Sequence, residues 1–420
     1  MENVKTLVCV MSRDSPWNST LGPVLRYLHG PMLARTKLSL LVALAVSAGC
    51  EGSVAIHISR DGGLPRDSAV LMPDADAGAT VPTAQCPAGS EPRVVQVDTP
   101  VKLDLLFMID DSPSMQEEQA NLARNFPRLI DELKKLPTGF PDLHLGVVSS
   151  DLGAGTSAAC GSTVGDRAVL QVRPGCGLDP KNGRYLVSEN GGTSNNFDGD
   201  LSDVFACLAE LGTQGCGFEH QLQAVRLALS GLVTENSGFL RSEAHLAIVY
   251  ITDEYDCSAP ADTTMFSGDI AGQDSSLRCS LWGHVCDGAP VPAAAFSAPL
   301  AQCGASPNGG GKLIPVQTFI DDMKQLRTQS VSVSVIGGWP ADADTATYAI
   351  GYDTTSPYPD ILTELPICQS ANGKAVVELR MKQFVDALGP TGKILSICQD
   401  DFSNAMEQIG QLINTTVECQ

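Results

Sequence analysis

The sequence predicts an α/β fold in which a doubly wound, largely parallel sheet carries helices on both faces. From residue 101 onward, short apolar segments with strand character alternate with segments of helical periodicity. Hydrophobic residues make up 43% of the chain, which is enough for a substantial core. Alternating strands and helices are typical of parallel sheets, because two parallel strands need a long crossover connection between them.

The first predicted strand, residues 101–109, is followed by a helix over 115–136. Leu122, Phe126 and Leu129 recur at helical spacing and share one face of that helix. The other predicted strands are 144–149, 168–172, 185–188, 245–252 (the strongest), 331–336 and 394–398, and the other predicted helices are 201–211, 218–232, 315–327, 378–388 and 402–413.

Two segments interrupt this alternation, at about 154–196 and 258–311. Both are loop-like, contain cysteine and are longer than ordinary connections. We interpret them as disulfide-stapled insertions in one domain that covers residues 93–420. Ahead of this domain, residues 51–92 are rich in Ala, Asp, Pro, Gly and Ser without apolar periodicity, which predicts a flexible linker.

The first 50 residues predict export. An apolar run over 38–48 follows Arg35 and Lys37, and it is shorter than the roughly 20 residues that cross a bilayer. The run ends in SAGC, which resembles a bacterial lipobox and implies that Cys50 is lipidated; an ordinary signal peptide cut nearby is the alternative. A signal peptide normally begins close to its charged region, so we expect Met32 to be the native start.

The number of cysteines also favours an exported protein. Apart from Cys9 and Cys50 there are twelve cysteines, an even number that predicts up to six disulfides. Zinc binding is disfavoured, because no two cysteines have C-x2-C spacing and the histidines do not cluster with them. We therefore expect a protein of the Gram-negative cell envelope that is held to a membrane by its lipid alone. Glu51, after the lipobox cysteine, favours the outer membrane.

The charge balance disfavours nucleic acid as a partner. The chain has 27 basic and 48 acidic residues, a formal net charge of −21. Without residues 1–49 the counts are 22 and 46, a net charge of −24. Phosphate contacts need clustered Lys and Arg, and the sequence contains no such cluster.

Hydroxyl and carboxylate side chains follow two of the predicted strands. The stretch FMIDDSPSMQ places Asp110, Ser112 and Ser114 at the carboxyl end of the first strand, and Asp253 ends the strongest one. Thr213 lies in a glycine-containing loop before a helix. In a doubly wound sheet, ligands bind outside the carboxyl ends of the strands, where the strand order reverses. Oxygen donors without His or Cys suit Mg²⁺, Mn²⁺ or Ca²⁺.

Each of these side chains also has a simpler explanation. Ser114 is able to cap the following helix, because Glu117 three residues later completes a capping box. Asp253 taken alone is an ordinary loop acid. Asp111 and Glu254, beside the motif aspartates, are interpreted as supporting or solvated residues. The order of the three motifs along the chain is what favours the metal site.

This arrangement resembles the von Willebrand factor type A domain and its metal-ion-dependent adhesion site, over roughly residues 98–340. Asp110, Ser112 and Ser114 match the Asp-x-Ser-x-Ser motif of the family. Asp253 matches its aspartate after the fourth strand, and Thr213 matches its loop threonine by position. The resemblance implies that these side chains hold a divalent cation directly or through water. It also implies that one coordination position is left for a carboxylate of a partner protein.

The resulting hypothesis is a non-catalytic binding or adhesion module that recognises an acidic residue of a protein partner through Mg²⁺, or through Mn²⁺ or Ca²⁺. A metal-dependent hydrolase is a second interpretation, since a divalent ion can activate water. A structural envelope protein whose site has lost its ion is a third. No Gly-x-Ser-x-Gly motif is present, and Glu219 with His220 at a helix start is interpreted as structural.

Overall fold

The computed structural model describes residues 100–419 except 156, 158–159, 161–163, 262, 268–272, 297, 327–330, 342 and 357, together with two short strands nearer the N-terminus. These strands, β1 (Lys5–Cys9) and β2 (Val54–Ile58), pair in antiparallel fashion. The predicted lipidation at Cys50, and the remainder of the predicted signal region and linker, lie outside the described residues. Among the helices that are described, none combines the length and apolar character needed to cross a bilayer.

The centre of the fold is a seven-stranded mixed sheet with the order β16-β11-β7-β3-β4-β5-β6. The first five strands in this order run parallel to one another, and β5 and β6 are antiparallel at one edge. The bounds are β3 (Lys102–Ile109), β4 (Asp142–Ser149), β5 (Leu186–Glu189), β6 (Ser194–Asn195), β7 (His245–Ile251), β11 (Val331–Gly337) and β16 (Gly392–Ser396). The predicted α/β fold with a largely parallel sheet is confirmed.

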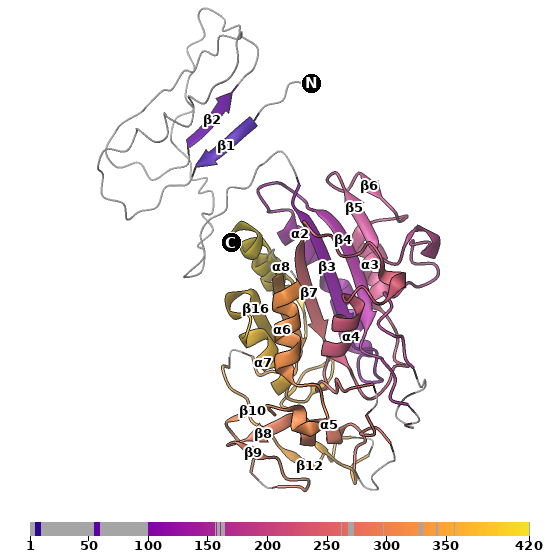
Figure 1. The fold of residues 1–420 in the computed structure, drawn as a ribbon, viewed down its shortest axis with the longest axis vertical. Coiled ribbons are helices and arrows are strands. Elements are labelled where there is room, and N and C mark those ends of the chain that lie inside the picture. The colour runs from indigo at the N-terminus through magenta and orange to yellow at the C-terminus, as the bar shows by residue number, and fades with distance from the viewer. Residues whose placement is uncertain are drawn as a thin grey trace, which may run out of the picture.

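The strand order reverses between β3 and β7. From β3 the chain moves outward to β4 and β5, then returns to β7 on the other side of β3 and continues to β11 and β16. At such a reversal the loops that follow the two strands lead to opposite faces of the sheet and leave a crevice at its carboxyl edge. In Figure 1 this edge faces the end of the molecule that carries β8, β9, β10 and β12.

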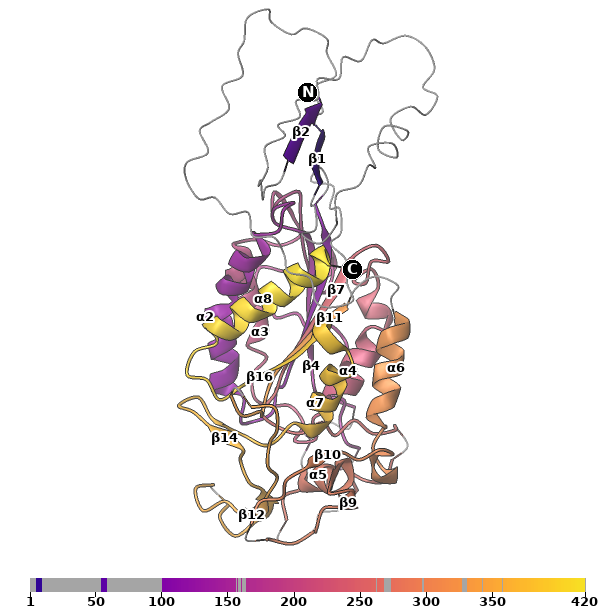
Figure 2. The ribbon, with the colours of Figure 1, turned by 90° about the vertical axis from the view of Figure 1, so that its left-hand side faces the viewer.

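Helices cover both faces of the sheet (Figure 2). On β3, Phe107 packs in the cluster formed with α2, α3 and α8, and its neighbour Met108 packs in the cluster formed with α4, α6 and α7. Neighbouring residues of a strand point to opposite faces, so an uninterrupted apolar strand supplies two cores. The bounds are α2 (Gln116–Leu133), α3 (Leu201–Ala209), α4 (Gln221–Ala228), α6 (Val316–Leu326), α7 (Leu379–Asp386) and α8 (Ser403–Glu418).

A smaller region lies at the carboxyl edge of the sheet and has a hydrophobic cluster of its own, which includes Trp339 and Tyr348. It combines the predicted insertion at 258–311 with the segment 338–378, which the sequence did not predict to be part of it. Its elements are α5 (Leu277–Gly283), β8 (His284–Cys286), β9 (Ala289–Pro290), β10 (Cys303–Ala305), β12 (Ile350–Tyr352), β13 (Leu362–Glu364), β14 (Cys368–Gln369) and β15 (Lys374–Ala375). The described residues also contain the 3-10 turns η1 (Pro180–Asn182), η2 (Thr234–Asn236), η3 (Gly309–Gly311) and η4 (Gly389–Thr391).

The prediction of disulfides is confirmed. The described pairs are Cys160–Cys216, Cys176–Cys207, Cys257–Cys279, Cys286–Cys303 and Cys368–Cys398, and Cys419 is disulfide-bonded as well. Cys86 lies outside the described residues. The pair Cys160–Cys216 joins the loop after β4 to the loop before α4. Loops at the carboxyl edge are therefore tied to one another covalently.

The predicted strand over 168–172 is wrong. Arg167 and Ala168 both have a φ of 56°, a left-handed conformation that is incompatible with an extended strand. The amide of Leu170 donates to Oδ1 of Asn236, and although the amide of Gln171 donates to the carbonyl of Val147 in β4 at 2.7 Å, the segment does not continue as a strand.

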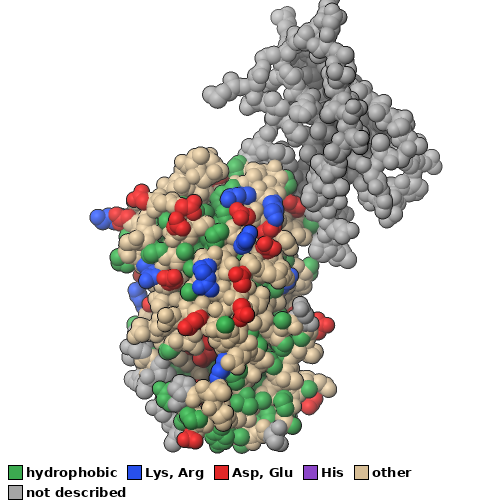
Figure 3. Space-filling model, turned by 180° about the vertical axis from the view of Figure 1, so that it is seen from behind, with side chains coloured by type: hydrophobic (Ala, Val, Ile, Leu, Met, Phe, Trp, Pro, Cys, Tyr) green, Lys and Arg blue, Asp and Glu red, His purple; other side chains and the backbone are tan. Residues whose placement is uncertain are grey.

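The surface opposite the view of Figure 1 mixes the two signs of charge. In Figure 3, Lys and Arg side chains are interspersed with Asp and Glu over the region of the sheet. Charged side chains are sparser at the end that carries the smaller region. The acidic excess of the chain is therefore not gathered into one patch on this face.

Candidate functional site

Four of the five predicted ligands lie together at the strand reversal. Asp110 follows β3 and Asp253 comes two residues after β7. The hydroxyl of Ser114 lies 3.1 Å from that of Ser112 and donates to Oδ1 of Asp253 at 3.1 Å, across 139 residues of sequence. Asp110, Ser112 and Asp253 are buried, whereas Ser114 is exposed. The cluster therefore opens to solvent at Ser114.

Ser114 does not cap the following helix. Helix α2 begins at Gln116 with Met115 at its N-cap position, and no side chain accepts a hydrogen bond there. The hydroxyl of Ser114 is directed instead to Ser112 and Asp253. The capping-box explanation of this serine is therefore wrong.

Asp110 is fixed by two short contacts. Its Oδ1 accepts a hydrogen bond from the amide of Ser112 at 2.8 Å, a turn that aspartate forms readily with the residue two positions later. Its Oδ2 accepts from the hydroxyl of Thr252 at 2.6 Å. Thr252 thus links the end of β7 to the end of β3. This role of Thr252 is not evident from the sequence, because the residue has no local feature beyond its place at the end of an apolar run.

The loop before α4 is held against the end of β3 by Gln119. The amide nitrogen of Gln119 donates to the carbonyl oxygens of Asp110 at 2.8 Å and Gly212 at 2.9 Å, and its Oε1 accepts from the amide of Gly212 at 3.0 Å. A second contact joins the amide of Gly215 to the carbonyl of Asp111 at 2.8 Å. A Cβ atom on Gly215 would lie 2.3 Å from Oδ1 of Asp111, so only glycine permits this approach.

Thr213, the fifth predicted ligand, lies in this loop and is partly buried. Within the described residues, no hydrogen bond joins its hydroxyl to Asp110, Ser112, Ser114 or Asp253. The loop that contains Thr213 therefore lies at the site, without a contact from its hydroxyl to these residues, whereas the other four predicted ligands lie together.

Burial and like charge raise the pKa of the acids at this edge. Burial is the main cause for Asp110 and Asp253, and the neighbouring Asp110 raises the pKa of Asp253 further. Burial, followed by the charge of Asp110, raises the pKa of Asp111 to about 8. Burial likewise raises the pKa of Glu118 to about 7. Among the described ion pairs, none involves Asp110 or Asp253, so no basic side chain supplies the counter-charge.

Glu219, a residue for which the sequence suggests only a structural role, is a further acid at this edge. It is fully buried, and its carbonyl accepts from the amide of Cys257 at 2.7 Å. Burial raises its pKa well above the usual value, and burial raises the pKa of Glu254 to about 8. Its neighbour His220 is also buried, which lowers the pKa of the imidazole to about 4. A single acid before a helix has no distinctive sequence signal, so only the fold reveals its position.

The donor set suits a hard divalent cation. Asp253 accepts from the hydroxyl of Ser114, Asp110 accepts from the amide of Ser112, and carboxylate and hydroxyl oxygens are the ligands that Mg²⁺ and Ca²⁺ prefer. In the part of the chain that the structure describes, no three or more His, Cys, Asp and Glu side chains converge as a metal-ligand group. An ion at this position would therefore depend on the serine hydroxyls as well as on the two carboxylates.

Comparisons with known proteins do not assign the chain to a family. No protein-family model matches it, and no curated protein matches its sequence. Proximal thread matrix protein 1 of the mussel byssus aligns with a TM-score of 0.31 and 9% identity, over 76% of this chain and 49% of that one. The human COPII-coat protein Sec24c aligns with a TM-score of 0.31 and 12% identity, over 75% of this chain and 33% of that one. The chain thus spans about half and about a third of these two proteins, and neither TM-score is high enough to support an argument about fold or function.

Proposed function

We propose that the chain is a non-catalytic binding module of the von Willebrand factor type A kind, in which Asp110, Ser112, Ser114 and Asp253 hold a divalent cation. The proposal rests mainly on one observation: the hydroxyl of Ser114 contacts both the hydroxyl of Ser112 and the carboxylate of Asp253 where the strand order reverses. A serine serving only the helix would donate or accept at the N-terminus of α2, and this one does not.

The charge of the site supports a cation. Asp110 and Asp253 are both buried, they repel each other, and no described basic residue pairs with either. Burying carboxylates without a counter-charge is costly, and a divalent ion removes that cost. Mg²⁺ is the ion we propose, with Mn²⁺ or Ca²⁺ as substitutes that accept the same oxygen donors. Thr213 would complete the site from the loop that Gln119 holds in place.

The proposed partner is a protein that offers an acidic residue to the ion. Beyond residue 49 the chain has a net charge of −24, which repels an acidic ligand at long range. A bound cation is the largest local charge and reverses the sign at the point of contact. Ser114 is the exposed member of the cluster, so a partner would approach from its side.

We further propose that the protein is attached to the Gram-negative envelope through a lipid on Cys50. The apolar run over 38–48 and the SAGC sequence support this proposal. The disulfides support it independently, because such bonds persist in oxidising compartments outside the cytoplasm.

Titration calorimetry of Mg²⁺ and Mn²⁺ into the metal-stripped, oxidised chain tests the proposed ion site. Asp110→Ala should abolish saturable binding at this site. Asp131→Ala is the matched control, because Asp131 is an exposed acid near the far end of α2, and it should bind as the wild type does. Equal binding by Asp110→Ala and the control would refute the proposal. Esterase or phosphodiesterase turnover that is lost in Asp110→Ala would favour the hydrolase instead.

A further inference from the structure

Two tyrosines lie exposed on the smaller region at the carboxyl edge of the sheet. Tyr352 ends β12 and is 55% exposed, and Tyr358 in the following loop is 71% exposed. Within the described residues, neither side chain has a hydrogen-bond partner or packs against another aromatic ring. The packing of the fold therefore does not account for these two side chains. Exposed aromatic residues of this kind are typical of protein interfaces, where they supply a large contact area.

Hydrogen bonds around Asp353 order the loop that carries the two tyrosines. The Oδ1 of Asp353 accepts from the amide of Thr355 at 2.9 Å and from its hydroxyl at 2.6 Å. The carbonyl of Asp353 accepts from the amide of Ser356 at 3.0 Å, and the hydroxyl of Ser356 accepts from the amide of Tyr358 at 3.2 Å. A surface that is ordered before binding loses less conformational entropy when a partner binds.

Lys374 fastens this loop to the edge of the proposed ion site. Its Nζ forms an ion pair with Oδ2 of Asp353 at 2.7 Å and also donates to the hydroxyl of Thr355. Two residues later in the chain, the amide of Val376 donates to the carbonyl of Asp253 at 3.0 Å. One ion pair, two residues of chain and one backbone hydrogen bond thus join the loop to Asp253.

The same segment lies against the beginning of α2. A Cβ atom on Gly373 would lie 2.3 Å from Oε1 of Glu118, which belongs to the first turn of that helix. Ser114, the exposed member of the proposed ion site, comes shortly before this turn. Figure 2 shows β12 and β14 at the same end of the molecule, below α2. The tyrosines and the opening of the ion site therefore share one end of the molecule.

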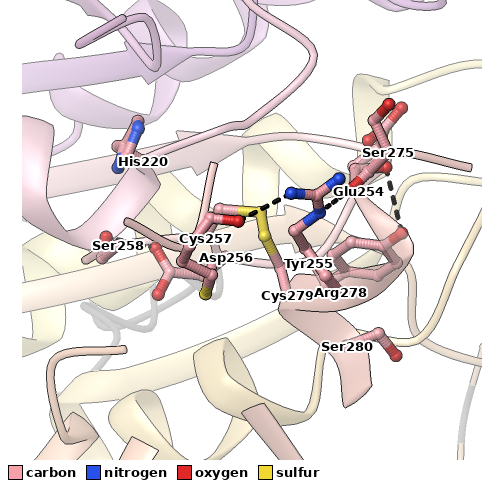
Figure 4. The surroundings of a disulfide bond; sticks show 12 residues. His220, Glu254, Tyr255, Asp256, Cys257, Ser258, Ser275, Arg278, Cys279 and Ser280 are labelled. Carbon is pink, nitrogen blue, oxygen red and sulfur yellow. Dashed lines mark hydrogen bonds between the residues drawn. A yellow bond between two sulfur atoms is a disulfide. The ribbon is translucent and has the colours of Figure 1, made fainter. Parts of the chain in front are cut away.

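A second series of contacts links β12 to the segment that follows β7. In this segment, Cys257 forms a disulfide with Cys279 of α5 (Figure 4). The hydroxyl of Ser280, the next residue of α5, donates to Glu364 of β13. Strand β13 pairs in turn with β12, the strand that Tyr352 ends. The loop is therefore fixed relative to the ion site from two directions.

We propose that Tyr352 and Tyr358 form a second contact for the partner, which binds as an extended protein segment. Its acidic residue would bind the ion, and an aromatic or aliphatic residue would pack on the two tyrosines. This inference rests on the proposed function, because it concerns the partner of that same ion. The path from Asp253 through Lys374 to Asp353 is at most on the order of 20 Å. An extended segment covers about 3.3 Å per residue, so the acid and the apolar residue should lie within about six residues of each other.

A random peptide library displayed on phage, selected on the oxidised full chain in Mg²⁺, tests this inference. We expect the enriched peptides to share an acidic residue and an aromatic or aliphatic residue within about six positions. A synthetic peptide of the enriched sequence is then titrated by fluorescence anisotropy. The double variant Tyr352→Ser with Tyr358→Ser should bind this peptide about tenfold more weakly, as expected for the loss of interface aromatics. It should still bind Mg²⁺ in calorimetry as the wild type does.

Leu232→Ser is the matched control. Leu232 is an apolar residue that is 79% exposed, and it follows the end of α4. Helix α4 begins at the carboxyl edge, where Gln221 donates to Thr252, so Leu232 lies beyond the other end of the helix. This variant should bind the peptide as the wild type does.

The outcomes separate the tyrosine contact from the ion site. Enrichment of peptides with an acidic residue alone, or equal peptide binding by the tyrosine double variant and the wild type, would overturn the tyrosine contact and leave the ion site intact. A selection that enriches no peptide would overturn it as well. Enrichment of apolar peptides whose binding needs the tyrosines, but is unchanged in Asp110→Ala, would support the tyrosine contact and refute the proposed function.

Discussion

Replacing Gln119 by Met tests how the site is assembled. Met has nearly the volume of Gln, so the change removes the polar contacts without opening a large cavity. Three hydrogen bonds are lost, of 2.8, 2.9 and 3.0 Å, and they join α2 to the carbonyl of Asp110 and to the loop at Gly212. At about 0.5–1.5 kcal/mol each, their loss should lower the free energy of unfolding by about 2–3 kcal/mol. Because the loop that contains Thr213 is then no longer held in place, the variant should also bind Mn²⁺ less tightly than the wild type.

The assay is urea unfolding of the oxidised chain, followed by far-UV circular dichroism, together with titration of Mn²⁺. Gln116→Met is the control, because Gln116 is an exposed residue of the same helix and should change neither quantity. A Gln119→Met variant within about 0.5 kcal/mol of the wild type, the range of ordinary surface changes, would refute the reasoning. Gln119 would then not hold the loop at the site.

Three further predictions concern the surroundings of the site. Gly215→Ala places a Cβ 2.3 Å from Oδ1 of Asp111, so we expect a displaced loop and a loss of about 1–3 kcal/mol in urea unfolding. Arg380→Met leaves Asp256 without the guanidinium 2.9 Å away, both groups being fully buried, and should cost about 3–5 kcal/mol in the same assay. Burial raises the pKa of Glu364 to about 8, so the folded chain binds its proton more tightly than the unfolded chain does. Stability should therefore fall as the pH rises from the unfolded value of 4.5 towards 8, by up to about 1.4 kcal/mol per pH unit from this group. Glu364→Gln should make the dependence of stability on pH shallower, and an unchanged pH dependence would contradict this prediction. Wild-type stability of Gly215→Ala or of Arg380→Met would contradict the prediction made for that variant.

Most of the sheet was predictable because its central strands are short apolar runs with clear ends, whereas the edge strand β6 (Ser194–Asn195) is polar and was not predicted. The order of the motifs along the chain then placed Asp110 and Asp253 at one edge, and the structure has them there. The special position of Gln119 can also be read from the sequence. Gln119 falls at helical spacing between Met115 and Leu122, so it is a polar residue on an apolar face of the helix.

Other parts of the structure had no local signal. The short hairpins of the segment 338–378 are only two or three residues per strand, too short to show alternation, and the disulfide Cys368–Cys398 anchors them to the sheet region. The run over 168–172 has the composition of a strand, yet the left-handed turn at Ala168 prevents it. Glu219 and Thr252 acquire their positions from contacts with residues far away in the chain, which composition and periodicity do not encode.

The most direct test of the proposed site is a crystal structure of the metal-stripped chain soaked in Mn²⁺, with the anomalous signal of the ion recorded. If the proposal is correct, an anomalous peak lies within coordination distance, about 2.0–2.6 Å, of the hydroxyls of Ser112 and Ser114 and of a carboxylate of Asp110 or Asp253. The absence of a peak there, with Ser114 still donating to Asp253, would contradict it. Those hydroxyls would then hold two strand ends together and bind no ion.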